Sequence, residues 1–136
     1  MDEEIRVKAC LAVVRDHRIV LVLKENKETG EDSWSLPGGR VYFGDSIDAV
    51  ALNGFKTGTG FEAEITGVLD VNENILTNKP YHSLTITFYG NITNPELIKD
   101  EEKARSTSRW FSFEELKDVT YYPEQAIHKA LGIDPS

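Results

Sequence analysis

The 136-residue chain has little sulfur and no long apolar segment, since it contains one cysteine and one methionine. Cys10 alone cannot form an internal disulfide, which excludes a small fold held by disulfides. The longest apolar runs, residues 9–14 and 19–23, are far too short to cross a bilayer. Residues 1–4 are acidic where a secretory leader would be basic. We therefore expect a cytoplasmic protein with no membrane partner.

Positive charge is also scarce, because the sequence has 15 basic and 23 acidic residues and a net charge of -8. The average surface of such a chain repels a nucleic-acid backbone. We therefore expect no nucleic-acid partner. The length is typical of one domain that buries roughly two thirds of the surface of its unfolded chain. We predict a single domain over residues 1–136.

Apolar, β-branched runs predict most of the strands. Residues 7–14 and 19–23 flank a polar segment, which is typical of a hairpin of buried strands. Shorter runs predict strands at residues 33–36, 63–68, 71–76 and 83–89, with a break at residues 37–39. The polar segment 91–108 predicts a long loop. The residues expected to be buried in the first hairpin are Ala9, Leu11, Val13, Val20 and Val22.

Helical spacing predicts a helix that starts within two residues of Ser46, with Asp45 as its N-cap and Asp48 three residues later. A short helix is expected at residues 113–116 and a last one at 124–131, opened by Pro123. The apolar residues that share one face of the first helix are Ile47, Val50, Ala51 and Phe55.

Residues 39–61 resemble the Nudix box, G-x5-E-x7-R-E-U-x-E-E-x-G-U, where U is apolar. Gly39 takes the first glycine, Phe55 the middle apolar position, and Gly60 and Phe61 the last two. The flanking order also resembles the family over nearly the whole chain: hairpin, Trp-x-Leu-Pro-Gly-Gly, helix, strands, acidic loop, Trp-Phe and closing helix. The resemblance implies an α+β fold, a Nudix-like α/β/α sandwich with a mixed central β-sheet.

The box is degenerate at its polar positions. Asp45 replaces the first Glu, Asn53 and Gly54 replace Arg-Glu, and Thr57 and Gly58 replace Glu-Glu. In the family, the Glu residues at 54, 57 and 58 bind the Mg²⁺ or Mn²⁺ that assists cleavage of nucleoside diphosphate derivatives. The resemblance therefore assigns no metal ligand and no catalytic residue here.

The same substitutions affect the helix, because Asn, Gly and Thr have lower helix propensity than Arg and Glu. We predict that the helix is short or irregular after Lys56. Since positions 54, 57 and 58 share a helix face, we also expect that restoring their three glutamates, with Asn53→Arg, creates Mg²⁺ affinity.

The resemblance places substrate phosphates against the loop after the Pro-Gly-Gly break, and this gives four candidate substrate-binding residues. Arg40 follows Gly39 in this loop, and its guanidinium can pair with phosphate in a bidentate way without a metal. The alternative is a surface arginine paired with Asp45 or Asp48. The candidates are Gly38, Gly39, Arg40 and Asp45.

Two functional hypotheses remain. The first is a Nudix-fold protein impaired in hydrolysis that binds a nucleotide-like ligand. The second is an active hydrolase of a nucleoside diphosphate derivative, with a relocated Mg²⁺ or Mn²⁺ site built from Asp45 and Glu101 or Glu102. The missing acids favour the first. Homodimers are common among similar proteins, so a homodimer is possible here, and the sequence leaves the oligomeric state open.

Overall fold

The computed structural model describes residues 4–76, 78, 80–95 and 107–132. No helix among these residues is long and apolar enough to span a bilayer. The elements in chain order are β1 (Ile5–Ala12), β2 (Val14–Arg15), β3 (Arg18–Glu25), β4 (Asp32–Ser35), β5 (Gly38–Val41), α1 (Ile47–Thr59), β6 (Ala63–Leu76), β7 (Tyr81–Ile92), β8 (Ser108–Ser112), α2 (Phe113–Leu116), β9 (Tyr121–Tyr122) and α3 (Glu124–Ala130).

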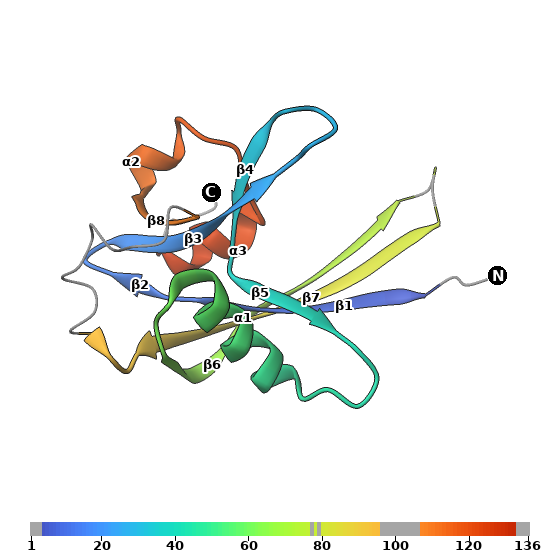
Figure 1. Cartoon of the computed structure of the whole chain (residues 1–136), viewed down its shortest axis with the longest axis horizontal. Helices are drawn as coiled ribbons and strands as arrows, with labels where there is room; N and C mark the ends of the chain where they lie inside the picture. Colours follow the sequence, from blue (N-terminus) through green and yellow to red (C-terminus); the bar gives the residue numbers. More distant parts are fainter. Residues whose placement is uncertain (1–3, 77, 79, 96–106, 133–136) are drawn as a thin grey trace.

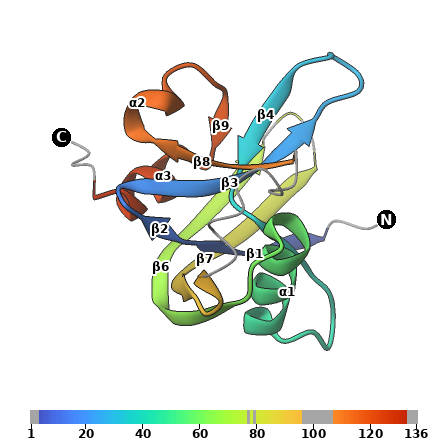
Figure 2. The ribbon, with the colours of Figure 1, turned by 60° about the vertical axis from the view of Figure 1, so that its left-hand side comes forward.

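Two sheets form the centre of the molecule. One has the order β5-β1-β7-β6 and is mixed, because β1 runs parallel to β7 and antiparallel to β5. The other has the order β2-β3-β4-β9, with β8 also paired to β3. Helix α1 lies on one side of β1 and β5, and the second sheet with α3 lies on the other (Figures 1 and 2). The predicted α+β sandwich with a mixed central sheet is confirmed.

Strand β1 separates two hydrophobic cores. Ala9 and Leu11 belong to the core beneath α1, together with Phe55. Ala12 belongs to the second core, which includes Ile127 of α3, and Cys10 packs against its edge. The alternation of side chains along an extended strand sends successive residues to opposite faces. This alternation makes β1 the common wall of both cores.

The predicted hairpin forms between β2 and β3, and its turn is Asp16 and His17. Both turn residues have positive φ, 52° and 63°, as a tight two-residue hairpin turn requires. Strand β1 itself pairs with β5 and β7 rather than with β3.

Four of the five residues expected to be buried in the first hairpin are buried. Val13 lies between β1 and β2 rather than inside a strand. The predicted burial of Val22 was wrong, because this residue is half-buried and lines a cleft.

Several predicted strand boundaries were wrong because they depend on pairing with distant strands. The expected break at residues 37–39 contains the start of β5, which pairs with β1. The two strands expected at 63–68 and 71–76 are one strand, β6, with irregular register near Gly67 and Asp70. Within the expected loop 91–108, β7 extends to Ile92 and β8 begins at Ser108. Residues 96–106 of that loop lie outside the described residues.

Helix α1 begins where the sequence predicts, but its N-cap is Ser46. The Ser46 hydroxyl accepts a hydrogen bond from the Ala49 amide at 3.5 Å. Asp45 was the wrong cap. Its Oδ2 instead accepts a hydrogen bond from the Tyr42 amide at 3.0 Å, which closes the loop before the helix.

The prediction of an irregular helix after Lys56 was also wrong, since α1 continues to Thr59. Gly60 ends it in a left-handed conformation (φ 83°) and donates its N–H to the Lys56 carbonyl at 2.8 Å. Thr59 is buried, and its hydroxyl donates to the Phe55 carbonyl at 2.8 Å. Packing of the last turn against the core therefore outweighs its weak intrinsic propensity.

Candidate functional site

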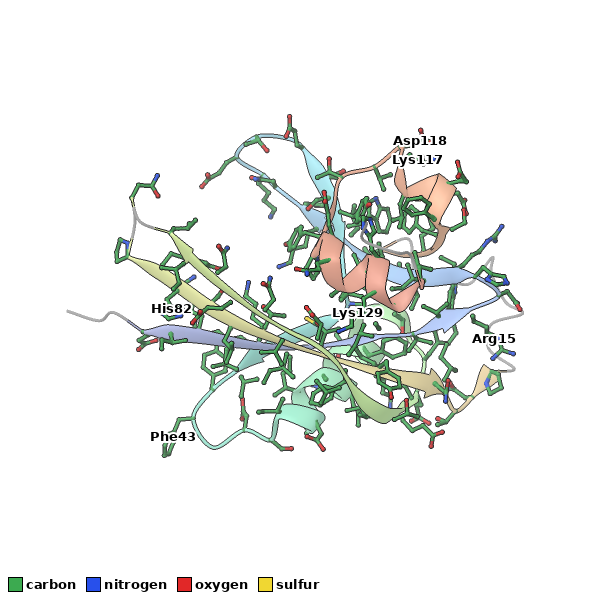
Figure 3. The ribbon with its side chains drawn as sticks, turned by 180° about the vertical axis from the view of Figure 1, so that it is seen from behind. Arg15, Phe43, His82, Lys117, Asp118 and Lys129 are labelled. Carbon is green, nitrogen blue, oxygen red and sulfur yellow. The ribbon has the colours of Figure 1, made fainter. Side chains whose placement is uncertain are left out.

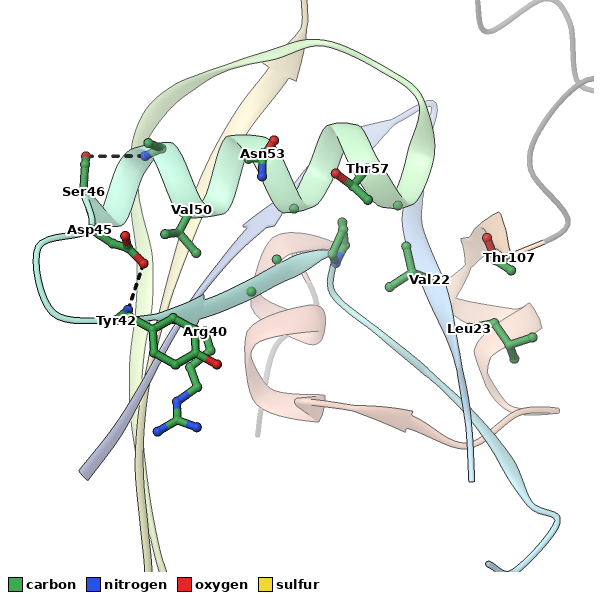
Figure 4. A pocket seen from close by; sticks show the side chains of 16 residues that line it. Val22, Leu23, Arg40, Tyr42, Asp45, Ser46, Val50, Asn53, Thr57 and Thr107 are labelled. Atoms are coloured by element: carbon green, nitrogen blue, oxygen red, sulfur yellow. Dashed lines mark hydrogen bonds between the residues drawn. The ribbon is translucent and has the colours of Figure 1, made fainter. Parts of the chain in front are cut away.

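A cleft of about 800 Å³ lies between α1, β5 and the end of β3, and we call it the α1 cleft. Its volume falls within the usual range of small-molecule sites. Figure 4 shows α1 running alongside β5, with Val22 and Leu23 of β3 at the far end. The four predicted site residues all line it: Gly38, Gly39, Arg40 and Asp45.

The helical wall of the α1 cleft carries neutral side chains, and among the described lining residues Asp45 is the only carboxylate and Arg40 the only cation. The Asp45 carboxylate is already an acceptor within its own loop. Asn53 and Thr57 supply an amide and a hydroxyl from α1. The cleft can therefore offer hydrogen bonds and shape, but little negative charge.

These donors do not fit the divalent ion that the family box holds. Mg²⁺ in proteins is usually anchored by one or two carboxylates in near-octahedral oxygen geometry. Residues 53–58 contain no carboxylate. No group of three or more His, Cys, Asp or Glu side chains converges within the part of the chain that the structure describes. No metal-dependent step follows from the residues that line the cleft.

Gly54 is a packing residue, because α1 lies almost directly on the backbone of β5. A Cβ atom at Gly54 would lie 2.4 Å from the Gly38 carbonyl carbon and 2.6 Å from its Cα. Gly38 in turn has no room for a side chain, since its Cβ would lie 2.2 Å from the Ala9 carbonyl oxygen. Helix, β5 and β1 therefore approach one another through two stacked glycines.

Gly58 makes a softer contact. A Cβ atom there would lie 2.8 Å from Cγ1 of Val22, a side-chain methyl rather than backbone. A glutamate at position 54 requires α1 to move away from β5. The expectation that three restored glutamates create a metal site is corrected on this point, because it assumed an unobstructed helix face.

Arg40 lies in β5 and not in a loop, which corrects its predicted setting. Its guanidinium contacts Glu4 at 3.2 Å and lies 4.9 Å from the Tyr42 ring centroid. The predicted alternative partners, Asp45 and Asp48, were wrong. In Figure 4 the Arg40 side chain points away from α1, on the other side of β5.

The loop between β5 and α1 exposes an aromatic side chain. Phe43 is fully exposed and points away from the molecule (Figure 3). Gly44 follows with φ 89°, and the Asp45 amide donates to the Tyr42 carbonyl at 2.9 Å. This turn brings Tyr42 to the mouth of the α1 cleft.

Sequence reasoning missed Val22 and Thr107 as lining residues, whereas Tyr42, whose ring the sequence offers as a face for a base or sugar, does line the cleft. Thr107 and Val22 approach because Leu23 donates its amide to the Thr107 carbonyl at 2.7 Å. Periodicity along the chain carries no signal for such a long-range contact. Glu101 and Glu102, the acids of the relocated-metal hypothesis, lie outside the described residues.

The fold and its helix-flanked cleft define an α+β sandwich of the Nudix type. A family model described as the NUDIX domain matches residues 4–130. The chain therefore belongs to the Nudix family. It is also 24% identical over 102 residues to a Caenorhabditis elegans protein named "Putative nudix hydrolase 1". That match covers 75% of this chain and 27% of the relative, so the chain spans about a quarter of that protein.

Solved structures resemble the chain at the level of fold. A NUDIX hydrolase from Nitrosomonas europaea has a TM-score of 0.75 at 18% identity, covering 93% of this chain and 88% of that one. A MutT NUDIX hydrolase from Burkholderia pseudomallei has a TM-score of 0.67 at 23% identity, covering 95% and 97%. A UDP-X diphosphatase has a TM-score of 0.64 at 22% identity, covering 95% and 62%. Each identity is below 25%, so these likenesses establish the fold alone.

Proposed function

We propose that this chain is a Nudix-fold protein that binds a nucleotide-like ligand and is impaired in metal-dependent hydrolysis. One contrast carries the proposal: the cleft has a volume of about 800 Å³, while residues 53–58 on its helical wall contain no carboxylate. A shaped cavity without the charge that holds Mg²⁺ suits binding better than turnover.

The ligand class is a nucleoside diphosphate derivative. The UDP-X diphosphatase shares the fold and is named for a substrate of this kind. The candidate contacts are the backbone of Gly38 and Gly39 in the α1 cleft and, on the other face of β5, the Arg40 guanidinium (Figure 4). Because the Arg40–Glu4 pair is exposed, a phosphate can replace Glu4 at little cost.

Calorimetry tests this function. The chain is titrated with UDP-glucose and ADP-ribose, each with and without Mg²⁺ or Mn²⁺, and product formation is followed in parallel. We expect binding that does not depend on the divalent ion and no product. Metal-dependent product that disappears in Asp45→Asn would support the alternative, a hydrolase with a relocated metal site.

A further inference from the structure

A second cavity of about 360 Å³ opens between the two sheets, and we call it the inter-sheet cavity. Its walls come from β1, β5, β6 and β7 on one side and from β3, β4 and β9 on the other. It shares Val22, Gly38, Gly39 and Arg40 with the α1 cleft. The two hollows therefore lie on either side of the edge strand β5.

A row of polar residues crosses the four-stranded sheet at this cavity. Arg40 of β5 lies opposite Lys8 of β1, Lys8 lies opposite Thr85 of β7, and Thr85 lies opposite Asn72 of β6. All four residues line the inter-sheet cavity. Cross-strand partners point to the same face of a sheet, so one wall presents two cations, a hydroxyl and an amide together.

The charge of the cavity is opposite to that of the chain. Its described lining contains Lys8, Lys24 and Arg40 but no Asp or Glu, although acidic residues outnumber basic ones by 23 to 15 in the sequence. Like charges directly opposite on neighbouring strands are destabilising. Glu4 offsets Arg40, whereas Lys8 and Lys24 make no ion pair with a carboxylate in the part of the chain that the structure describes.

The charges of the two lysines also act on neighbouring titratable groups. Burial raises the pKa of the Cys10 thiol to about 11, and the charges of both Lys8 and Lys24 act on it in the opposite direction. The pKa of Tyr81 is lowered by its hydrogen bond with Ser83, with a smaller contribution from Lys8. The Lys24 ammonium lies 5.9 Å from the Tyr122 ring centroid, and both residues belong to the wall that faces Lys8. Both lysines therefore face the cavity.

We infer that the inter-sheet cavity binds the anionic part of a ligand, a diphosphate group, through Lys8, Lys24 and Arg40 and without a metal ion. Lysine supplies point charges and arginine a bidentate fork, and both bind phosphate oxygens. Assigning this diphosphate to the ligand of the α1 cleft rests on the proposed function. The anion site itself rests on the charge and geometry of the cavity.

Inorganic pyrophosphate is the probe, titrated calorimetrically in the presence of EDTA. We expect saturable binding that Lys8→Gln and Lys24→Gln each weaken by roughly tenfold, because a hydrogen bond to a charged group is lost. The matched control is Lys56→Gln, which removes the same charge from an exposed pair with Glu62 at 3.0 Å. That control should change the affinity by no more than about twofold.

Lys8→Arg keeps the charge and should retain most of the binding, and equal melting temperatures confirm that the variants are folded. Absence of pyrophosphate binding, or an equal loss in Lys56→Gln, would overturn the inference.

Titrations with ADP, and with adenosine as the matching compound that lacks phosphate, separate this inference from the proposed function. Binding of ADP that is insensitive to Lys8 and Lys24 would refute the inference and leave the function standing. Binding of pyrophosphate through these lysines, with no binding of any nucleoside diphosphate compound, would support the anion site and refute the function.

Discussion

At the scale of single residues, one of the glutamate positions of the box, residue 54, has become a packing position. Gly54 permits α1 to lie on the backbone of Gly38, and a side chain there would overlap it. The sequence shows only that an acid is absent. The tertiary contact shows why a glycine can be required in the middle of a helix, where it costs about 1 kcal/mol relative to alanine.

Alanine substitutions in α1 should therefore differ by position. Gly54→Ala should lower the free energy of unfolding by about 1–2 kcal/mol, because overpacking against backbone exceeds the gain in helix propensity. Gly58→Ala should be near neutral, since Val22 can adjust its methyl group. Urea denaturation of both variants measures the difference. Equal stabilisation of the two would show that α1 does not lie so close to β5.

The Cys10 thiol should make stability depend on pH above 9. Burial raises its pKa from 9.0 to about 11, so the folded chain keeps a proton that the unfolded chain releases. Stability is then lost as pH rises from about 9 to 11, by up to about 1.4 kcal/mol per pH unit.

The measurement is the free energy of unfolding between pH 8 and 11, compared with Cys10→Ala. The variant should show a smaller slope, because it lacks the thiol. Tyrosines and lysines that titrate in the same range are common to both proteins, so their contribution cancels in the comparison. Parallel slopes would contradict a thiol whose pKa is raised in the folded chain.

At the scale of elements, the sequence predicts the parts whose signal is local. The apolar runs indicate β1 and β3, and helical spacing indicates the start of α1. Strands β5, β8 and β9 were missed because they are short and exist through distant partners, as in the pairing of Ile19 with Phe111. The candidate residues Gly38, Gly39, Arg40 and Asp45 do meet in one cleft. The stacking of Gly54 on Gly38 and the row that links Arg40 to Asn72 depend on register between elements, which no single segment encodes.

The N-terminus of α1 gives a prediction at this scale. Ser46→Ala should lower the free energy of unfolding by about 1 kcal/mol, because the hydroxyl that accepts the Ala49 amide is lost. In a domain of this size that corresponds to a fall in melting temperature of about 3 °C. Asp48→Ala, an exposed substitution in the same first turn, is the matched control and should have a smaller effect. Equal effects would argue against Ser46 as the cap.

At the scale of the whole molecule, β5 is an edge strand with a different hollow on each face. The side toward α1 is largely neutral, and the side toward the second sheet is basic. The family box uses carboxylates and a cation on the helix side. Here the helix side has lost its carboxylates, and three cations, Lys8, Lys24 and Arg40, line the cavity between the sheets.

The response of the melting temperature to Mg²⁺ follows from the missing carboxylates. An ion that binds only the folded state raises stability with the logarithm of its free concentration over its dissociation constant. We expect no saturable shift in the unmodified chain, because residues 53–58 offer no carboxylate. The variant with Asn53→Arg, Gly54→Glu, Thr57→Glu and Gly58→Glu should melt below the unmodified chain without Mg²⁺, since position 54 has no room for a side chain.

Thr57→Glu alone is the control, because this position is exposed and accepts a longer side chain without the collision at Gly54. It should keep the original melting temperature and gain little from Mg²⁺, since one carboxylate competes poorly with water. Differential scanning calorimetry of the three proteins across Mg²⁺ concentrations makes the comparison. A saturable rise in the unmodified chain would mean that the folded protein holds a divalent ion elsewhere. The hydrolase with a relocated metal site would then replace the binding function proposed here.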